Sequence, residues 1–111
     1  MTAEKHTGRL WQLHTKTTDE DGRAILFVEG RLDHSAAEEF EAAVAGYAPN
    51  GSAEATLDLS GVDYISSAGL KVIKGLADRQ AAAGARLTLR APSIAARLAL
   101  ELSGLDGLVD Q

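Results

Sequence analysis

The sequence predicts an α/β fold: a mixed, mainly parallel β-sheet with an N-terminal β-hairpin and about three main helices. Apolar runs of strand length alternate along the chain with amphipathic segments of helical period, which favours parallel strands joined by helices. The chain has 111 residues, 45% of them apolar, which suits one globular domain with a core of its own. We expect residues 1–9, which are mostly polar, to form a flexible tail and residues 10–111 to form the domain.

The first two expected strands lie close together in the sequence. Residues 10–16 alternate between apolar and polar side chains, which is typical of a half-buried strand. The polar segment at 18–22 ends in glycine and indicates a turn. Residues 24–28 form a continuous apolar run, AILFV, which favours a central strand covered on both faces. The two strands should form a hairpin.

The first helix is expected after Gly30. The sequence SAAE at 35–38 has the spacing of a capping box, so the helix should begin there. Apolar residues then recur at steps of three and four and define one buried stripe: Ala37, Phe40, Val44 and Tyr47. Residues 55–59 indicate a third strand, and residues 60–65 are expected to form a loop.

The second helix should begin at the serine pair at 66–67 and end at Gly84. Its inner face is expected to carry Leu70, Ile73, Leu76 and Ala77, and its outer face Lys71, Lys74, Asp78 and Arg79. Residues 86–89 indicate a fourth strand.

Ser93 is a good N-cap for a third helix, in which Ile94, Leu98 and Leu102 recur at steps of four and which Gly104 closes. Residues 108–109 should add a final edge strand.

Composition excludes several classes of function. Eleven basic and sixteen acidic residues give a net charge of −5, which disfavours nucleic acid or an anionic membrane surface as the main partner. No apolar run is long enough for a transmembrane helix, and the N-terminus lacks the apolar run of a signal peptide. The absence of cysteine excludes disulfides, thiolate metal sites and cysteine nucleophiles. We expect a soluble, cytoplasmic protein.

The sequence also lacks the usual catalytic motifs. Its three histidines are scattered without metal-ligand spacing, and GxxxxGK[ST], GxGxxG and GxSxG are all absent. We therefore expect a binding protein without a metal or cofactor, and not an enzyme. A small enzyme or nucleotide-binding domain is therefore less favoured than either a switching module or a docking module.

The most informative segment is TLDLSGVDYISSAGL at 56–70, where an apolar strand leads through a short connection to a helix beginning at Ser66 and Ser67. The first N–H groups of a helix have no internal partner, so a phosphate is favoured there. A phosphoserine would add roughly −1.5 to −2 charges and could close one interface. The alternative is purely structural, because serine is a preferred N-cap.

Four stretches together suggest a family: VEGRLD at 28–33, LDLSGV at 57–62, YISSAGL at 64–70 and LELSGL at 100–105. In this order they resemble the STAS-domain family of anti-sigma factor antagonists, and the resemblance runs from about residue 10 to residue 109. It implies a single STAS-type domain that acts in bacterial partner switching and transcription regulation.

The resemblance implies a phosphorylation switch. In the family, an anti-sigma factor that is also a serine kinase binds the unphosphorylated antagonist and releases it on phosphorylation, and a serine phosphatase restores binding. Ser67 falls on the phosphoacceptor position. Ser66 falls where the family often has Asp, which makes it a rival acceptor, and Ala68 falls where the family often has Ser or Thr. Gly69 is retained and fits a close backbone approach.

The same resemblance indicates a partner-binding surface. Arg31, Asp33 and His34 should lie near the serine pair, since sites gather at the carboxyl ends of parallel strands. Asp33 has an alternative role as a helix cap. Lys71 and Lys74 could contact the kinase from the exposed helix face.

An alternative function is a non-phosphorylated docking subunit of a transporter or signalling assembly. A monomer is expected, because no large exposed apolar stripe is evident.

Overall fold

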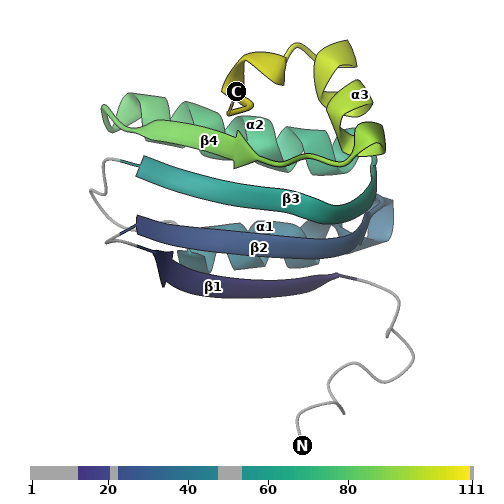
Figure 1. Cartoon of the computed structure of the whole chain (residues 1–111), viewed down its shortest axis with the longest axis horizontal. Coiled ribbons are helices and arrows are strands. Elements are labelled where there is room, and N and C mark those ends of the chain that lie inside the picture. Colours follow the sequence, from purple (N-terminus) through teal and green to yellow (C-terminus); the bar gives the residue numbers. More distant parts are fainter. Residues whose placement is uncertain (1–12, 21–22, 48–53, 111) are drawn as a thin grey trace, which may run out of the picture.

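The computed structural model describes residues 13–20, 23–47 and 54–110. One sheet carries two helices, α1 and α2, on one face, while α3 lies beyond β4 at the upper right of Figure 1. The elements in chain order are β1 (His14–Glu20), β2 (Arg23–Leu32), η2 (His34–Ala36), α1 (Ala37–Tyr47), β3 (Glu54–Ile65), α2 (Ser67–Ala82), β4 (Arg86–Arg90), α3 (Ile94–Leu102) and η3 (Asp106–Leu108).

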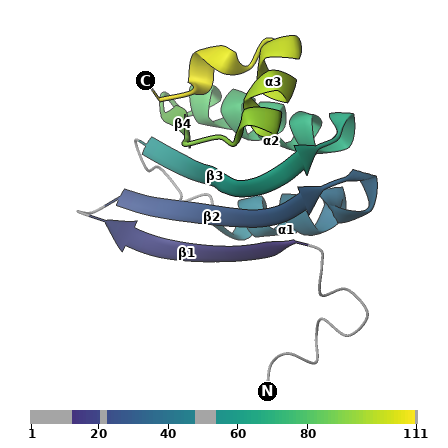
Figure 2. The same ribbon diagram turned by 45° about the vertical axis from the view of Figure 1, so that its right-hand side comes forward.

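The sheet has the strand order β1-β2-β3-β4, in which β1 and β2 are antiparallel and β2, β3 and β4 are parallel. This confirms the predicted mixed sheet, the N-terminal hairpin and the three main helices, as the two views in Figures 1 and 2 show. The expected final edge strand is only a parallel bridge between Val109 and Leu89, because η3 takes up the residues just before it.

The core lies between the sheet and its helices. Leu26, Leu57 and Leu89 are aligned across the three parallel strands, and each is at most 2% exposed. The helices meet this row with fully buried side chains: Phe40 and Val44 from α1, and Ile73 and Leu76 from α2. Burying each such side chain contributes roughly 1.5–3 kcal/mol.

The other face of the sheet lies toward solvent over β1 and β2 (Figures 1 and 2). One register step from the leucine row, Lys16, Phe27, Asp58 and Arg90 form a second row across all four strands. Residues 24–28 are nevertheless buried or half-buried throughout, as expected for a covered strand: on this face Ile25 is 3% exposed and Phe27 is half-buried. The guanidinium of Arg90, 5.4 Å from the centroid of the Phe27 ring, covers part of this side chain.

Strands extend into two segments that were expected to be loops. β1 continues to Glu20, so much of the predicted turn at 18–22 is strand. β3 runs on to Ile65 through the predicted loop at 60–65, with irregular register opposite β2. A Cβ atom on Gly61 would lie 2.4 Å from Cγ of Glu29, so glycine permits this close pairing of strands.

The capping box at 35–38 is a wrong prediction. Asp33 caps this turn: its Oδ1 accepts the backbone N–H of Ala36 at 3.0 Å and the hydroxyl of Ser35 at 2.9 Å. A single 3-10 turn, η2, therefore precedes α1. The buried stripe begins at Ala36, since Ala37 is only half-buried.

Ser93 caps α3 as predicted, with its Oγ accepting the backbone N–H of Ala96 at 3.1 Å. The apolar repeat of this helix, however, points outward: Ile94 is 90%, Leu98 56% and Leu102 82% exposed. The helix packs instead through Ala96 and Leu100, both fully buried. The expectation of no large exposed apolar stripe is therefore wrong. Among the described residues, no helix is long and apolar enough to cross a membrane.

Candidate functional site at the strand ends

The candidate site lies where the carboxyl ends of β2 and β3 meet. Leu32 at the end of β2 pairs with Ile65 at the end of β3. Directly beyond, the backbone N–H of Ser66 donates to the carbonyl oxygen of Leu32 at 2.8 Å. The start of α2 is therefore fixed against the end of β2. This arrangement places the Arg31–His34 segment beside the serine pair, as the parallel-strand argument predicts.

The two serines occupy different positions. Ser66 is the half-buried N-cap of α2, and its Oγ accepts the backbone N–H of Gly69 at 3.2 Å. Ser67 is the first residue of the helix and is exposed. Its hydroxyl makes no hydrogen bond to any residue that the structure describes. The structural hypothesis therefore accounts for Ser66, and it leaves the Ser67 hydroxyl without a structural role.

Gly69 is buried at the back of the site. A Cβ atom there would lie 3.2 Å from Cβ and the carbonyl oxygen of Leu32 and from Cγ2 of Ile65. Such contacts are tighter than packed side chains normally make, so the residue permits the close approach of α2 to the strand ends. Ala68 beside it is half-buried.

Arg31 and Tyr64 form the exposed edge of the site. They are partners in the register of β2 and β3, and the Arg31 guanidinium lies 4.7 Å from the centroid of the Tyr64 ring. Tyr64 is 43% exposed, unusual for so large an apolar ring, and cation–π stacking orders both side chains. Sequence reasoning did not select Tyr64 as a candidate, although the aromatic position of the resembled motif was a signal for it.

Asp33 is occupied with capping. The hydrogen bond from Ser35, helped by the backbone N–H of Ala36 and the charge of Arg31, holds the pKa of the Asp33 carboxyl below its usual range. His34 is exposed within η2. Lys71 and Lys74 lie exposed on α2, one and two turns after Ser67, and Lys74 Nζ is 3.2 Å from Oδ2 of Asp78.

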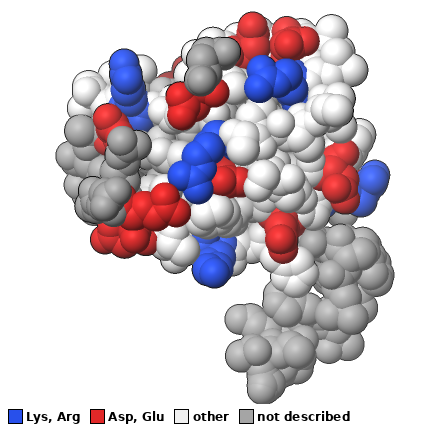
Figure 3. Space-filling model, viewed as in Figure 1, with Lys and Arg blue, Asp and Glu red and all other residues white. Residues whose placement is uncertain are grey.

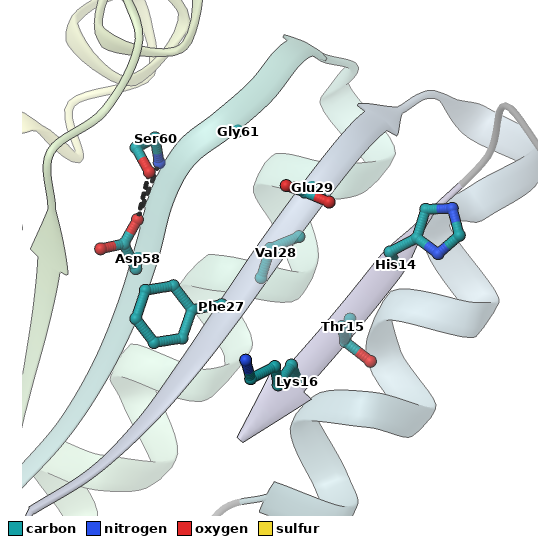
Figure 4. Close-up of a pocket in the computed structure, with 9 residues that line it drawn as sticks. All are labelled: His14, Thr15, Lys16, Phe27, Val28, Glu29, Asp58, Ser60 and Gly61. Atoms are coloured by element: carbon teal, nitrogen blue, oxygen red, sulfur yellow. Dashed lines mark hydrogen bonds between the residues drawn. The ribbon is translucent and has the colours of Figure 1, made fainter. Parts of the chain in front are cut away.

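A shallow hollow of about 730 Å³ lies on the open sheet face. Figure 4 shows its lining from three strands, with Lys16 and Phe27 beside Asp58 and Ser60. Asp58 accepts from the backbone N–H and the hydroxyl of Ser60 at 3.0 and 2.7 Å and from Nε of Arg90 at 2.8 Å. Burial acts to raise the pKa of Asp58, but these hydrogen bonds outweigh it and the pKa lies below its usual range.

The carboxylate of Asp58 is thus held as part of the sheet. Sequence reasoning missed its role: Asp58 and Ser60 both lie in the LDLSGV stretch, but Arg90 is 32 residues further along the chain. Within residues 13–20, 23–47 and 54–110, no three His, Asp or Glu side chains gather closely enough to hold a metal ion.

The fold and the strand-end site define a small α/β domain built on one mixed sheet. More particularly, the chain belongs to the STAS-domain family, since the family model described as "Mlab, STAS domain" matches residues 15–110.

A curated relative is named an anti-sigma factor antagonist. BtrV of Bordetella bronchiseptica, named as such an antagonist, is 42% identical over 53 residues, which cover 48% of this chain and 46% of BtrV. The match thus spans less than half the length of that curated relative.

Solved structures agree with this placement. The crystal structure of an anti-sigma factor antagonist from Mycobacterium paratuberculosis has a TM-score of 0.77 and 26% identity, covering 86% of this chain and 81% of that one. The Bacillus cell fate determinant SpoIIAA in its phosphorylated form has a TM-score of 0.66, covering 88% of both chains. At 20% identity, the SpoIIAA likeness shows the fold alone.

Proposed function

We propose that this protein is an anti-sigma factor antagonist that binds an anti-sigma serine kinase when Ser67 is unphosphorylated and is released when Ser67 is phosphorylated. The observation that carries the proposal is the contrast between the serines. Ser66 is half-buried and caps α2, whereas Ser67 presents an exposed hydroxyl without a hydrogen bond to the described residues. A kinase needs a hydroxyl that can reach the γ-phosphoryl group in line.

The position of Ser67 favours the phosphorylated form electrostatically. The first turn of α2 contains no acidic residue, and the positive end of its dipole stabilises a negative group there. Lys71, one turn further on, is placed for an i,i+4 ion pair with a phosphate on Ser67. The phosphate would add roughly two negative charges to an otherwise neutral helix start, enough to oppose docking of a complementary partner.

The transfer needs chemistry that the partner supplies. The γ-phosphoryl group passes from ATP to Oγ of Ser67, ADP leaves, and the hydroxyl proton goes to a base in the kinase. A serine phosphatase then hydrolyses the phosphoester and returns the hydroxyl and inorganic phosphate. The antagonist contributes a positioned hydroxyl and a docking surface, and it binds no cofactor of its own.

The proposed contact surface surrounds Ser67. Arg31 with Tyr64, His34, Lys71 and Lys74 supply its exposed side chains. Asp33, Ser66, Ala68 and Gly69 shape it through caps and close packing.

Affinity purification with tagged full-length variants tests the switch. Ser67→Ala should retain the kinase from cell extract. Ser67→Asp should retain at least roughly tenfold less kinase, because the aspartate adds a charge at the interface. Thr17→Asp adds the same charge on exposed β1 and serves as the matched control.

Retention of the kinase at equal strength by Ser67→Ala and Ser67→Asp would contradict the proposal. Co-purification of a transporter complex with every variant, and of no kinase, would favour the docking-subunit alternative.

A further inference from the structure

Helix α3 is apolar on two opposite sides. Ala96 and Leu100 are fully buried against the rest of the domain, whereas Ile94, Leu98 and Leu102 are 90%, 56% and 82% exposed. At 100° per residue, Leu98 points directly away from the midpoint of the buried pair. We call Ile94, Leu98 and Leu102 the outer stripe. In Figure 3 the area over α3, at the upper right, has white surface beside blue and red groups.

An exposed row of large aliphatic side chains is an unusual feature, since single exposed leucines are common but aligned ones are not. The row is not needed to hold the helix. Ser93 caps it, donating at 2.6 Å to the carbonyl oxygen of Val62 and accepting from Ala96, and Leu100 anchors it in the core. The outer stripe is therefore not needed to pack the domain, and its composition is that of an interaction surface.

We propose that the outer stripe binds the same stripe of a second copy of this chain, with the two α3 helices antiparallel about a two-fold axis at Leu98. Such a rotation sets residue 98 − n level with residue 98 + n of the other copy. Leu98 then faces itself, and Ile94 faces Leu102 twice. The stripe is therefore complementary to itself, as an isologous two-fold contact requires.

The charged edge of the stripe obeys the same symmetry. Arg97 and Glu101 lie on one edge of the outward face, and both are exposed. Within the part of the chain that the structure describes, neither makes an ion pair. The rotation brings this edge of one helix against the same edge of the other. Arg97 of each copy then lies about 3 Å along the helix axis from Glu101 of the other copy, so the same juxtaposition occurs twice.

The contact should be weak. Three apolar side chains on a nine-residue helix give less than the roughly 800 Å² per partner of a standard interface. We therefore expect a reversible dimer with a dissociation constant on the order of 10 µM to 1 mM. The inference does not rest on the phosphorylation switch, and either can fail without the other.

Sedimentation of the full-length protein from about 10 µM to about 1 mM tests the dimer directly. Leu98→Glu should weaken association at least about tenfold, because two buried charges would face each other. Ala45→Glu, on the exposed side of α1, should leave it unchanged.

Arg97→Glu and Glu101→Arg should each weaken self-association. An equimolar mixture of the two variants should associate more tightly than either variant alone. In the mixed dimer, the two glutamates of one chain lie beside the two arginines of the other.

The chain contains no cysteine, so a single introduced thiol reports its own symmetry mate. Leu98→Cys should form a disulfide-linked dimer under mild oxidation, whereas Ala45→Cys should form no disulfide-linked dimer.

A monomer throughout the concentration range, undiminished dimerisation of Leu98→Glu, or a charge-swapped mixture no tighter than its components would each overturn the proposal. In the first case the outer stripe would have to serve a different protein.

Discussion

The backbone N–H of Ser66 donates to the carbonyl oxygen of Leu32 at 2.8 Å, joining the first turn of α2 to the end of β2. The same serine caps the helix through its hydroxyl. The backbone N–H and the hydroxyl of Ser66 are therefore both used to hold the site, which leaves the next residue, Ser67, at the surface with a hydroxyl available for chemistry.

The division of work between the serines predicts different effects on stability. Ser66→Ala should lower the free energy of unfolding by about 1 kcal/mol through loss of the N-cap, whereas Ser66→Asp should retain the cap. Ser67→Ala should stay within about 0.5 kcal/mol of the parent, because no hydrogen bond is lost. Urea unfolding of the three variants checks this. An equal loss for both alanine variants would show that Ser67 is structural too.

Gly69 should tolerate no side chain. Gly69→Ala pushes a methyl group to 3.2 Å from Leu32 and Ile65, so we expect a loss of about 1–3 kcal/mol in unfolding free energy. Gly75→Ala in the same helix is the control. Its nearest neighbour would be Nη1 of Arg79 at 3.9 Å, so helix propensity should instead stabilise by up to about 1 kcal/mol. Equal effects of the two substitutions, measured by thermal unfolding, would contradict the packing argument.

The hydroxyl of Tyr47 joins α1 to two strands. It lies 2.8 Å from the carbonyl oxygen of Ala24 and accepts the backbone N–H of Thr56 at 2.7 Å. Tyr47→Phe removes these hydrogen bonds and should cost about 1–3 kcal/mol in denaturant unfolding. Tyr64→Phe, which removes an exposed hydroxyl, should change stability by less than about 0.5 kcal/mol. A Tyr47→Phe variant as stable as the parent would show that the Tyr47 hydroxyl does not stabilise the fold.

Asp58 should make the fold sensitive to acid. Its pKa in the folded protein lies below the unfolded value, so ionised Asp58 stabilises the fold above that unfolded value, and the contribution is lost as pH falls through the folded pKa. Asp58→Asn should be less stable than the parent at neutral pH by about 1–3 kcal/mol, and the difference should shrink toward pH 2.

Unfolding free energies measured between pH 7 and pH 2 test whether the difference between the parent and Asp58→Asn shrinks as the pH falls. Asp78→Asn, which removes a solvent-exposed ion pair with Lys74, is the matched control. A constant difference between Asp58→Asn and the parent at all pH values would show that titration of Asp58 does not contribute.

Local sequence signals predicted much of the fold, because they depend only on residues that are close together in the sequence. The helix caps need only a hydroxyl at the right offset: Ser93 caps α3 as predicted, and α2 begins at the predicted serine pair, of which Ser66 is the cap. The end of β3 was missed because pairing with β2 carries polar residues through to Ile65. That pairing depends on Glu29 and Gly61, which are 32 positions apart and form no local pattern.

Periodicity also failed to say which side of α3 faces the core. A repeat at steps of four identifies a helix, but Ile94 and Leu98 are outside while the smaller Ala96 fits against the sheet layer. The candidate site fared better, because the parallel strands bring Arg31 and Tyr64 together by register alone. Capping by Asp33 was one of the two roles considered for it.

The central claim, that Ser67 carries a reversible phosphate, is tested most directly by peptide mass spectrometry of the protein isolated from its native cells. Chymotrypsin cleaves after Tyr64 and Leu70, and the short peptide 65–70 contains both serines. We predict a phosphoryl group on Ser67, with occupancy that changes with growth conditions, and none on Ser66. Peptides unmodified under every condition, or modified only at Ser66, would contradict the account.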